Sequence, residues 1–158
     1  MKKNLFLLLL LIAFQINAQV LKLNDLKYLV DSNIEKADTY ILSKGYDFFE
    51  NTTQNENCTS ILWAYKRNSN NNQSSNFLGK DICSEGFKYI FYQTSSRDIY
   101  NLVRDEVKKD GFKFVNQQTG KNGEIKYTYS KNKYEVTMFA GLSNDNRNNY
   151  YISMVSKN

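Results

Sequence analysis

The chain of 158 residues has no histidine, no proline and only two cysteines. Histidine is the commonest general base and metal ligand, and it usually activates a serine or cysteine nucleophile. Its absence excludes Ser-His-Asp and Cys-His triads within one chain, as well as zinc sites of the His-Glu-x-x-His type. An enzyme of this composition would depend on carboxylates, lysine or tyrosine. We therefore predict no catalytic motif, no cofactor and no metal ion.

The sequence also lacks a second long apolar run. Its one long apolar run lies at the N-terminus. Residues 1–3 (Met-Lys-Lys) are positively charged, residues 5–14 are almost continuously apolar, and Ala18 is the small residue that signal peptidase favours. The run is well short of the roughly 20 apolar residues that a membrane-spanning helix needs. We predict a signal peptide over residues 1–18 and export, to the periplasm or out of the cell, without a transmembrane anchor. An uncleaved anchor and a buried N-terminal helix are the alternatives.

Export decides how the two cysteines, Cys58 and Cys83, are interpreted. An even pair in an oxidising compartment most simply forms a disulfide. Two free buried thiols, or a redox or metal role, are the alternatives. The spacing of the two cysteines fits no redox or metal motif, so we predict the disulfide.

The formal charge of +5 is modest, and it includes Lys2 and Lys3 of the predicted signal peptide. A mature chain that begins near Gln19 would therefore have a weaker positive bias, which indicates at most a weak attraction to anionic surfaces. Because an exported chain meets little genomic DNA, we predict no nucleic-acid partner.

Apolar residues recur every three or four positions in two segments, which predicts amphipathic helices over residues 24–44 and 96–110. Each segment is followed by a glycine, Gly45 or Gly111, where helices commonly stop. A Ser95-x-x-Asp98 capping box precedes the second helix. The rest of the chain after the signal peptide is predicted as strand or loop.

The two halves of the chain resemble each other. Residues 44–48 (Lys-Gly-Tyr-Asp-Phe) align with residues 110–114 (Asp-Gly-Phe-Lys-Phe) at an offset of 66, and two strand-like segments align at offsets of 64 and 63. We predict a tandem repeat in which each copy is a helix followed by an antiparallel meander. The first copy spans residues 19–95, with a long Asn/Ser-rich loop over residues 68–85, and the second spans residues 96–158. The alternative is that the apolar pattern of helix and strand alone produces the match.

The clearest predicted hairpin lies in the second copy. A two-residue turn at Lys131 and Asn132 would pair Tyr129 with Tyr134. This register places the apolar residues of both strands on one face of the sheet.

Alternation along the strands divides their side chains between two faces of the sheet. One face is predicted to pack against the helices as an aromatic-rich core of Ile61, Trp63, Tyr65, Phe87, Tyr89, Phe91, Ile125, Tyr127, Val136, Met138, Ile152 and Met154. The other face carries lysines and other polar residues, together with large apolar side chains that a face open to water does not need. From these we predict a partner-binding surface of Ile90, Tyr92, Phe139, Tyr151 and Val155. The alternatives are that these residues are scattered, or that the N-terminal segment or the long loop covers them.

These features predict an α+β fold, in which two helix-plus-meander copies form one curved antiparallel sheet with both helices on one face. In outline this arrangement is similar to the tandem saddle folds of TATA-box-binding proteins and of secreted β-lactamase inhibitor proteins. No residue motif carries the resemblance, so it implies an architecture and no activity.

The leading functional prediction is an exported, non-catalytic binding protein that engages another protein or an envelope component through the helix-free face. A second is a small hydrolase or polysaccharide-active enzyme, which would need a deep pocket holding two of Asp47, Glu50, Glu124 and Glu135. A third is a structural subunit of a surface assembly, which concentration-dependent oligomers would reveal.

Overall fold

The structure is a computed structural model that describes residues 20–55, 58–68, 73–83, 88–121, 123–142 and 148–157. The predicted signal peptide, residues 1–18, lies outside these ranges. Phe87, one of the predicted core residues, lies outside them too. Among the described helices, none is long and apolar enough to cross a membrane.

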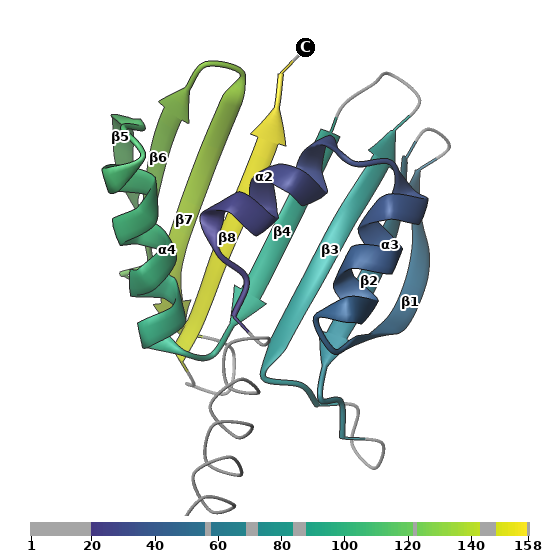
Figure 1. The fold of residues 1–158 in the computed structure, drawn as a ribbon. Helices are drawn as coiled ribbons and strands as arrows, with labels where there is room; N and C mark the ends of the chain where they lie inside the picture. Colours follow the sequence, from purple (N-terminus) through teal and green to yellow (C-terminus); the bar gives the residue numbers. More distant parts are fainter. Residues whose placement is uncertain are drawn as a thin grey trace, which may run out of the picture.

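Within the described part of the chain, three helices and eight strands form an α+β fold, as predicted (Figure 1). The helices are α2 (Leu23–Asp31), α3 (Ile34–Ser43) and α4 (Arg97–Lys109). The strands are β1 (Tyr46–Asn55), β2 (Cys58–Tyr65), β3 (Asn76–Cys83), β4 (Lys88–Thr94), β5 (Lys113–Thr119), β6 (Ile125–Lys131), β7 (Tyr134–Leu142) and β8 (Asn148–Ser156). All of them belong to one open antiparallel sheet with the order β1-β2-β3-β4-β8-β7-β6-β5.

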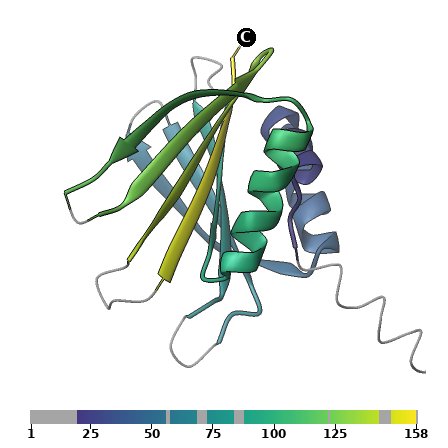
Figure 2. The same cartoon turned by 90° about the vertical axis from the view of Figure 1, so that its left-hand side faces the viewer.

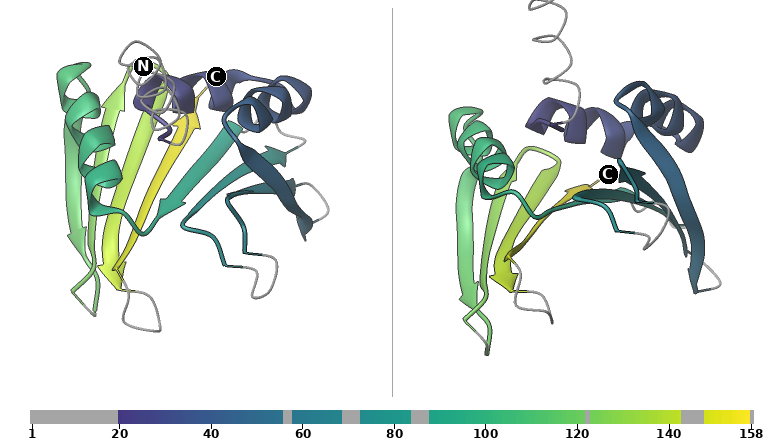
Figure 3. Two further views of the ribbon diagram at one scale, coloured as in Figure 1. Left: turned by 60° about the horizontal axis from the view of Figure 1, so that its bottom comes forward. Right: turned by 90° about the horizontal axis from the view of Figure 1, so that it is seen from below.

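The sheet consists of two meanders that meet at their last strands. Strands β1 to β4 are neighbours in sequence order, as are β5 to β8, and β4 pairs with β8. Helices α2 and α3 precede the first meander, and α4 precedes the second. The three helices lie on one side of the sheet, and no described helix lies on the other side (Figure 3). Helix α2 contacts both β4 and β8, so it crosses the junction between the meanders.

The hydrophobic core lies between the helices and the sheet. Trp63 of β2 is fully buried there, and its indole nitrogen donates a hydrogen bond to Asp38 Oδ1 of α3 at 2.8 Å. Other core residues that are at most 1% exposed include Leu26, Leu29, Ile41, Leu78, Ile90, Tyr92, Val103, Val107, Met138, Ile152 and Met154. Every helix and both meanders therefore contribute to one core.

The predicted helix over residues 24–44 is in fact two helices, α2 and α3, because the chain breaks at Ser32 and Asn33. Ser32 has an extended backbone, with φ −69° and ψ 150°. The Asn33 side chain accepts a hydrogen bond from the Lys36 amide at 3.0 Å and so caps the start of α3. The fold therefore has two helices before the first meander where the sequence predicts one.

A lysine buried beneath the end of α2 is a feature that the sequence did not indicate. Lys80 of β3 is only 4% exposed, and its Nζ donates to the carbonyl oxygens of Leu29 and Val30 at 2.8 and 3.2 Å. These carbonyls belong to the last turn of α2, where the helix itself supplies no donors. Burial, helped by the positive charge of Lys88, lowers the pKa of Lys80 to about 8.

Residues 76–83 form strand β3, whereas the sequence predicts a loop over residues 68–85. Gly79, Lys80 and Asp81 at the centre of this segment have low strand propensity. The strand forms because it is paired on both sides, with β2 and with β4. Pairing and burial thus outweigh local preference in this part of the chain.

The turn between β6 and β7 lies one residue later than predicted, at Asn132 and Lys133. Asn132 has a positive φ of 51°, which asparagine tolerates better than most residues. Tyr129 therefore pairs with Val136 and not with Tyr134. A shift of two residues keeps the predicted division between the two faces.

The predicted disulfide between Cys58 and Cys83 is present, with an S–S distance of 2.03 Å. The two cysteines are directly paired across β2 and β3, and their Cα atoms are 4.2 Å apart. The bond therefore fixes the register of these two strands. A disulfide fits a protein that folds in an oxidising compartment.

Candidate binding face

The side of the sheet opposite the helices, which we call the open face, is crossed by one row of directly paired residues. From β2 to β5 the row contains Leu62, Gly79, Phe91, Ser153, Thr137, Thr128 and Asn116. Their neighbours along the strands, such as Trp63, Tyr92 and Met138, belong to the core. Because side chains alternate along a strand, the row lies on the open face. Its first-meander half is apolar and aromatic, and its second-meander half carries hydroxyl and amide groups.

Ile90 and Tyr92, two of the predicted partner-binding residues, lie in the core and not on the open face. Their exposed fractions are 1% and 0%. Tyr89 and Phe91, which the alternation predicts in the core, occupy the open face instead. Residues 89–92 read Tyr-Ile-Phe-Tyr, so no polar residue marks the side that meets water. The neighbouring strands β3 and β8 set the orientation of β4.

The other three predicted residues, Phe139, Tyr151 and Val155, lie on the open face, and each is partly exposed. Phe139 on β7 and Tyr151 on β8 are directly paired across their strands. Their part in binding a partner stays a prediction.

Tyr89, Phe91, Phe139 and Tyr151 form what we call the aromatic cluster, at the centre of the open face. The rings of Phe91 and Tyr151 are parallel to within 16°, with centroids 5.4 Å apart. The Tyr89 ring lies 6.2 Å from Phe91, and the hydroxyls of Tyr89 and Tyr151 are hydrogen bonded at 2.6 Å. Burial, together with this hydrogen bond, raises the pKa of Tyr151 above its ordinary value. The rings of Tyr89, Phe91 and Tyr151 are therefore held by one another.

Two glycines lie directly under rings of the aromatic cluster. A Cβ atom at Gly79 would lie 2.1 Å from Cε1 of Phe91, so the ring covers the glycine backbone. A Cβ atom at Gly141 would lie 2.8 Å from Cζ of Phe139. Because real Cβ contacts are never this close, both rings depend on glycine for their position.

Aromatic side chains continue from the cluster towards the β1 edge. The Phe49 and Phe77 rings meet edge to face, with centroids 5.4 Å apart. The Arg67 guanidinium lies 4.9 Å from the centroid of Phe49, within the range of a cation–π contact. The apolar half of the open face thus extends from β1 through β2, β3 and β4 to β8.

The chain matches no known protein-family model, no curated protein and no solved structure. The resemblance to saddle folds therefore remains one of outline, and the open face is interpreted from its own residues.

Two acidic side chains on the open face, Asp81 and Glu135, have partners within the fold. Asp81 accepts a hydrogen bond from Ser60, and Glu135 forms an ion pair with Lys157 at 2.7 Å. Thr128 and Ser153 are each only 8% exposed. The centre of the open face therefore presents rings and neutral groups more than charge.

The four carboxylates of the hydrolase hypothesis are divided between the two meanders. Asp47 and Glu50 lie on the edge strand β1, whereas Glu135 lies on β7 and Glu124 just before β6, beyond the centre of the sheet. Glu135 pairs with Ser130, at the opposite end of β6 from Glu124. Among the described residues, no group of three or more acidic or cysteine side chains could hold a metal ion. Three surface depressions that the described residues line contain none of these four carboxylates.

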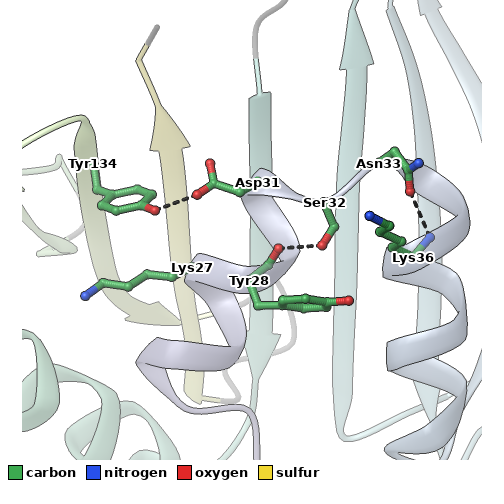
Figure 4. A pocket seen from close by; sticks show the side chains of 7 residues that line it. All are labelled: Lys27, Tyr28, Asp31, Ser32, Asn33, Lys36 and Tyr134. Carbon is green, nitrogen blue, oxygen red and sulfur yellow. Dashed lines mark hydrogen bonds between the residues drawn. The ribbon is translucent and has the colours of Figure 1, made fainter.

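A surface depression lies at the break between α2 and α3, on the helix side of the molecule (Figure 4). It is lined by Lys27, Tyr28, Asp31, Ser32, Asn33, Lys36 and Tyr134. Asp31 accepts hydrogen bonds from Tyr134 at 2.5 Å, from Lys133 at 3.0 Å and from Ser156 at 3.0 Å. Burial alone would raise the pKa of Asp31, but these hydrogen bonds outweigh it and lower the pKa. Asp31 thus fastens the end of α2 to β7 and β8, which is a structural role.

Proposed function

We propose that the chain is an exported, non-catalytic binding protein that engages another protein or an envelope component through its open face. The observation that carries the proposal is the aromatic cluster, which is partly exposed on a helix-free face. Aromatic anchors dominate the binding free energy of many interfaces. Rings that are already held in place lose little conformational entropy on binding.

Export is supported by three features. Residues 1–18 have the charge, the apolar run and the small final residue of a signal peptide. The Cys58–Cys83 disulfide favours an oxidising compartment. The lack of a membrane-spanning helix among the described residues fits a chain that is released after cleavage near Ala18.

A tandem repeat with a curved sheet would make the open face concave, which suits a face that holds a partner. The repeat is supported by equivalent backbone details. Gly45 and Gly111 have φ of 81° and 80°, and the ladders shift register between Phe48 and Glu50 and, 66 residues later, between Phe114 and Asn116. The curvature is supported by Figures 2 and 3, where the outer strands bend away from the helices.

Partner capture from an envelope extract by immobilised mature protein tests the proposal. We expect Phe139→Ala and Tyr151→Ala to reduce capture by at least about tenfold, because each removes a ring from the centre of the face. Circular dichroism and urea unfolding must show that both variants stay folded.

Two further variants serve as controls. Tyr28→Ala removes a ring that is 44% exposed on α2, on the helix side, and should leave capture unchanged. Tyr92→Ala removes a core ring and should lower stability by about 3–5 kcal/mol. Equal loss of capture in Tyr28→Ala and Tyr151→Ala, or none in the folded open-face variants, would contradict the proposal.

A further inference from the structure

Both edges of the sheet are unpaired in the described part of the chain. Strand β1 pairs only with β2, and strand β5 pairs only with β6. An edge strand presents backbone N–H and C=O groups that can pair with another strand. All seven residues of β5 are exposed to solvent. The molecule therefore has two places where its sheet could continue.

Large apolar side chains lie exposed at these edges. Phe48 on β1 is 54% exposed, and Phe114 and Val115 on β5 are 58% and 53% exposed. Phe48 and Phe114 are 66 residues apart, each three residues after a glycine with positive φ. Isolated exposed apolar residues are common, but matching ones on both edge strands point to the edges as contact surfaces.

The two edges differ in charge. Strand β1 carries Asp47 and Glu50 and no lysine or arginine, whereas β5 carries Lys113 and no acidic residue. All three side chains are exposed, and none of them forms an ion pair with another described residue. An acidic edge and a basic edge are complementary to each other.

The topology also fixes how two copies would meet. Every neighbouring pair in the eight-stranded sheet is antiparallel, so the outermost strands β1 and β5 run in opposite directions. A second copy in the same orientation would therefore present its β1 antiparallel to β5 of the first copy. The new ladder would have the same geometry as those within the sheet.

We propose that copies of this chain associate edge to edge, with β5 of one copy pairing with β1 of the next. The occupant of each edge is thus a second copy of the chain. Pairing two β1 strands would bring four carboxylates together, and pairing two β5 strands would bring two lysines together. Only the β5–β1 contact places opposite charges on facing strands, and like charges across a ladder are destabilising.

Such a contact is head to tail, so each copy keeps one free edge and growth continues until a ring closes or a filament forms. The open face is not covered in this contact. The inference therefore stands apart from the proposed binding function.

Sedimentation velocity and light scattering of mature protein, residues 19–158, test the inference. We expect the average mass to rise with concentration above that of one copy, and to fall at high salt because the edge charges are screened. Lys113→Glu makes both edges acidic, and Asp47→Lys with Glu50→Lys makes both edges basic. Each of these variants should remain a single copy.

Two combinations of these variants provide the decisive test of charge complementarity between the edges. An equimolar mixture of the acidic-edge and basic-edge variants should recover the higher masses, and so should one chain with all three substitutions. Lys36→Glu, the same charge change on an exposed residue of α3, should behave as wild type. Urea unfolding checks that the edge variants remain folded.

If the wild-type protein keeps the mass of one copy up to millimolar concentration, the inference is overturned. The charges and the register shifts of the edge strands would then serve only to block pairing. Oligomers that persist unchanged in the acidic-edge and basic-edge variants would overturn it too, because another surface would be responsible. Partner capture through the open face can succeed or fail independently of either result.

Discussion

The buried lysine beneath α2 predicts an unusual dependence of stability on pH. Lys80 has a pKa of about 8 in the folded chain, against 10.5 for an ordinary lysine, because burial disfavours its charged form. Between these two pH values the unfolded chain binds more protons than the folded chain, so stability rises with pH. Below about pH 8 both states are protonated, and the folded state bears the full cost of the buried charge.

The size of the effect follows from the shift in pKa. At 1.36 kcal/mol per pH unit, the lowered pKa corresponds to about 3 kcal/mol, of which about 2 kcal/mol is recovered between pH 7 and 9.5. Higher pH is less informative, because burial raises the pKa of Tyr92 and Tyr100 to about 12. Ionisation of these tyrosines in the unfolded chain therefore lowers stability above about pH 10.

Urea unfolding followed by the fluorescence of Trp63, the only tryptophan, measures this dependence. The midpoint should rise by about 1 M urea between pH 7 and 9.5 in the wild type. Lys80→Met removes the charge and should flatten the dependence, whereas Lys36→Met, at an exposed position, should keep it. A flat wild-type profile, or an equal rise in Lys80→Met, would refute the reasoning.

Three further predictions concern the open face, the disulfide and the helix break. Gly79→Ala should displace the Phe91 ring and cost about 1–3 kcal/mol in urea unfolding; a neutral effect would show that the ring does not need the glycine. Reducing the Cys58–Cys83 disulfide, which spans 25 residues, should cost about 3 kcal/mol, and an unchanged urea midpoint after reduction would contradict this. Asn33→Ala should cost about 1 kcal/mol through loss of the α3 cap, with Asn33→Asp as the variant expected to retain the stability.

Much of the fold could be predicted because its signals are local. Residues 96–110 combine regular apolar spacing with a capping serine and a final glycine, and the helix α4 forms at Arg97–Lys109. Its cap is Ser96, one residue after the predicted Ser95. The disulfide follows from two cysteines and a signal-like leader. These features need no knowledge of distant parts of the chain.

The predictions fail where contacts between residues far apart in the sequence determine the local structure. Asn33 is a capping residue that interrupts an apolar pattern otherwise continuous through α2 and α3, and its signal is weaker than that pattern. The orientation of β4 cannot be read from Tyr-Ile-Phe-Tyr, so the alternation predicts Ile90 and Tyr92 on the wrong face. Nothing in the local sequence around Lys80 indicates that the end of a helix lies above it.

The position of β8 has a consequence for how the chain folds. It follows every other described strand in the sequence, yet it lies in the middle of the sheet, between β4 and β7 and beneath α2. Shortening the chain from its C-terminus would therefore remove the centre of the molecule before either edge. The two meanders cannot be joined until residues 148–156 are present, so the eight-stranded sheet can form only once all of its strands are available. Without β8, the strands β1 to β4 and the strands β5 to β7 have no ladder between them.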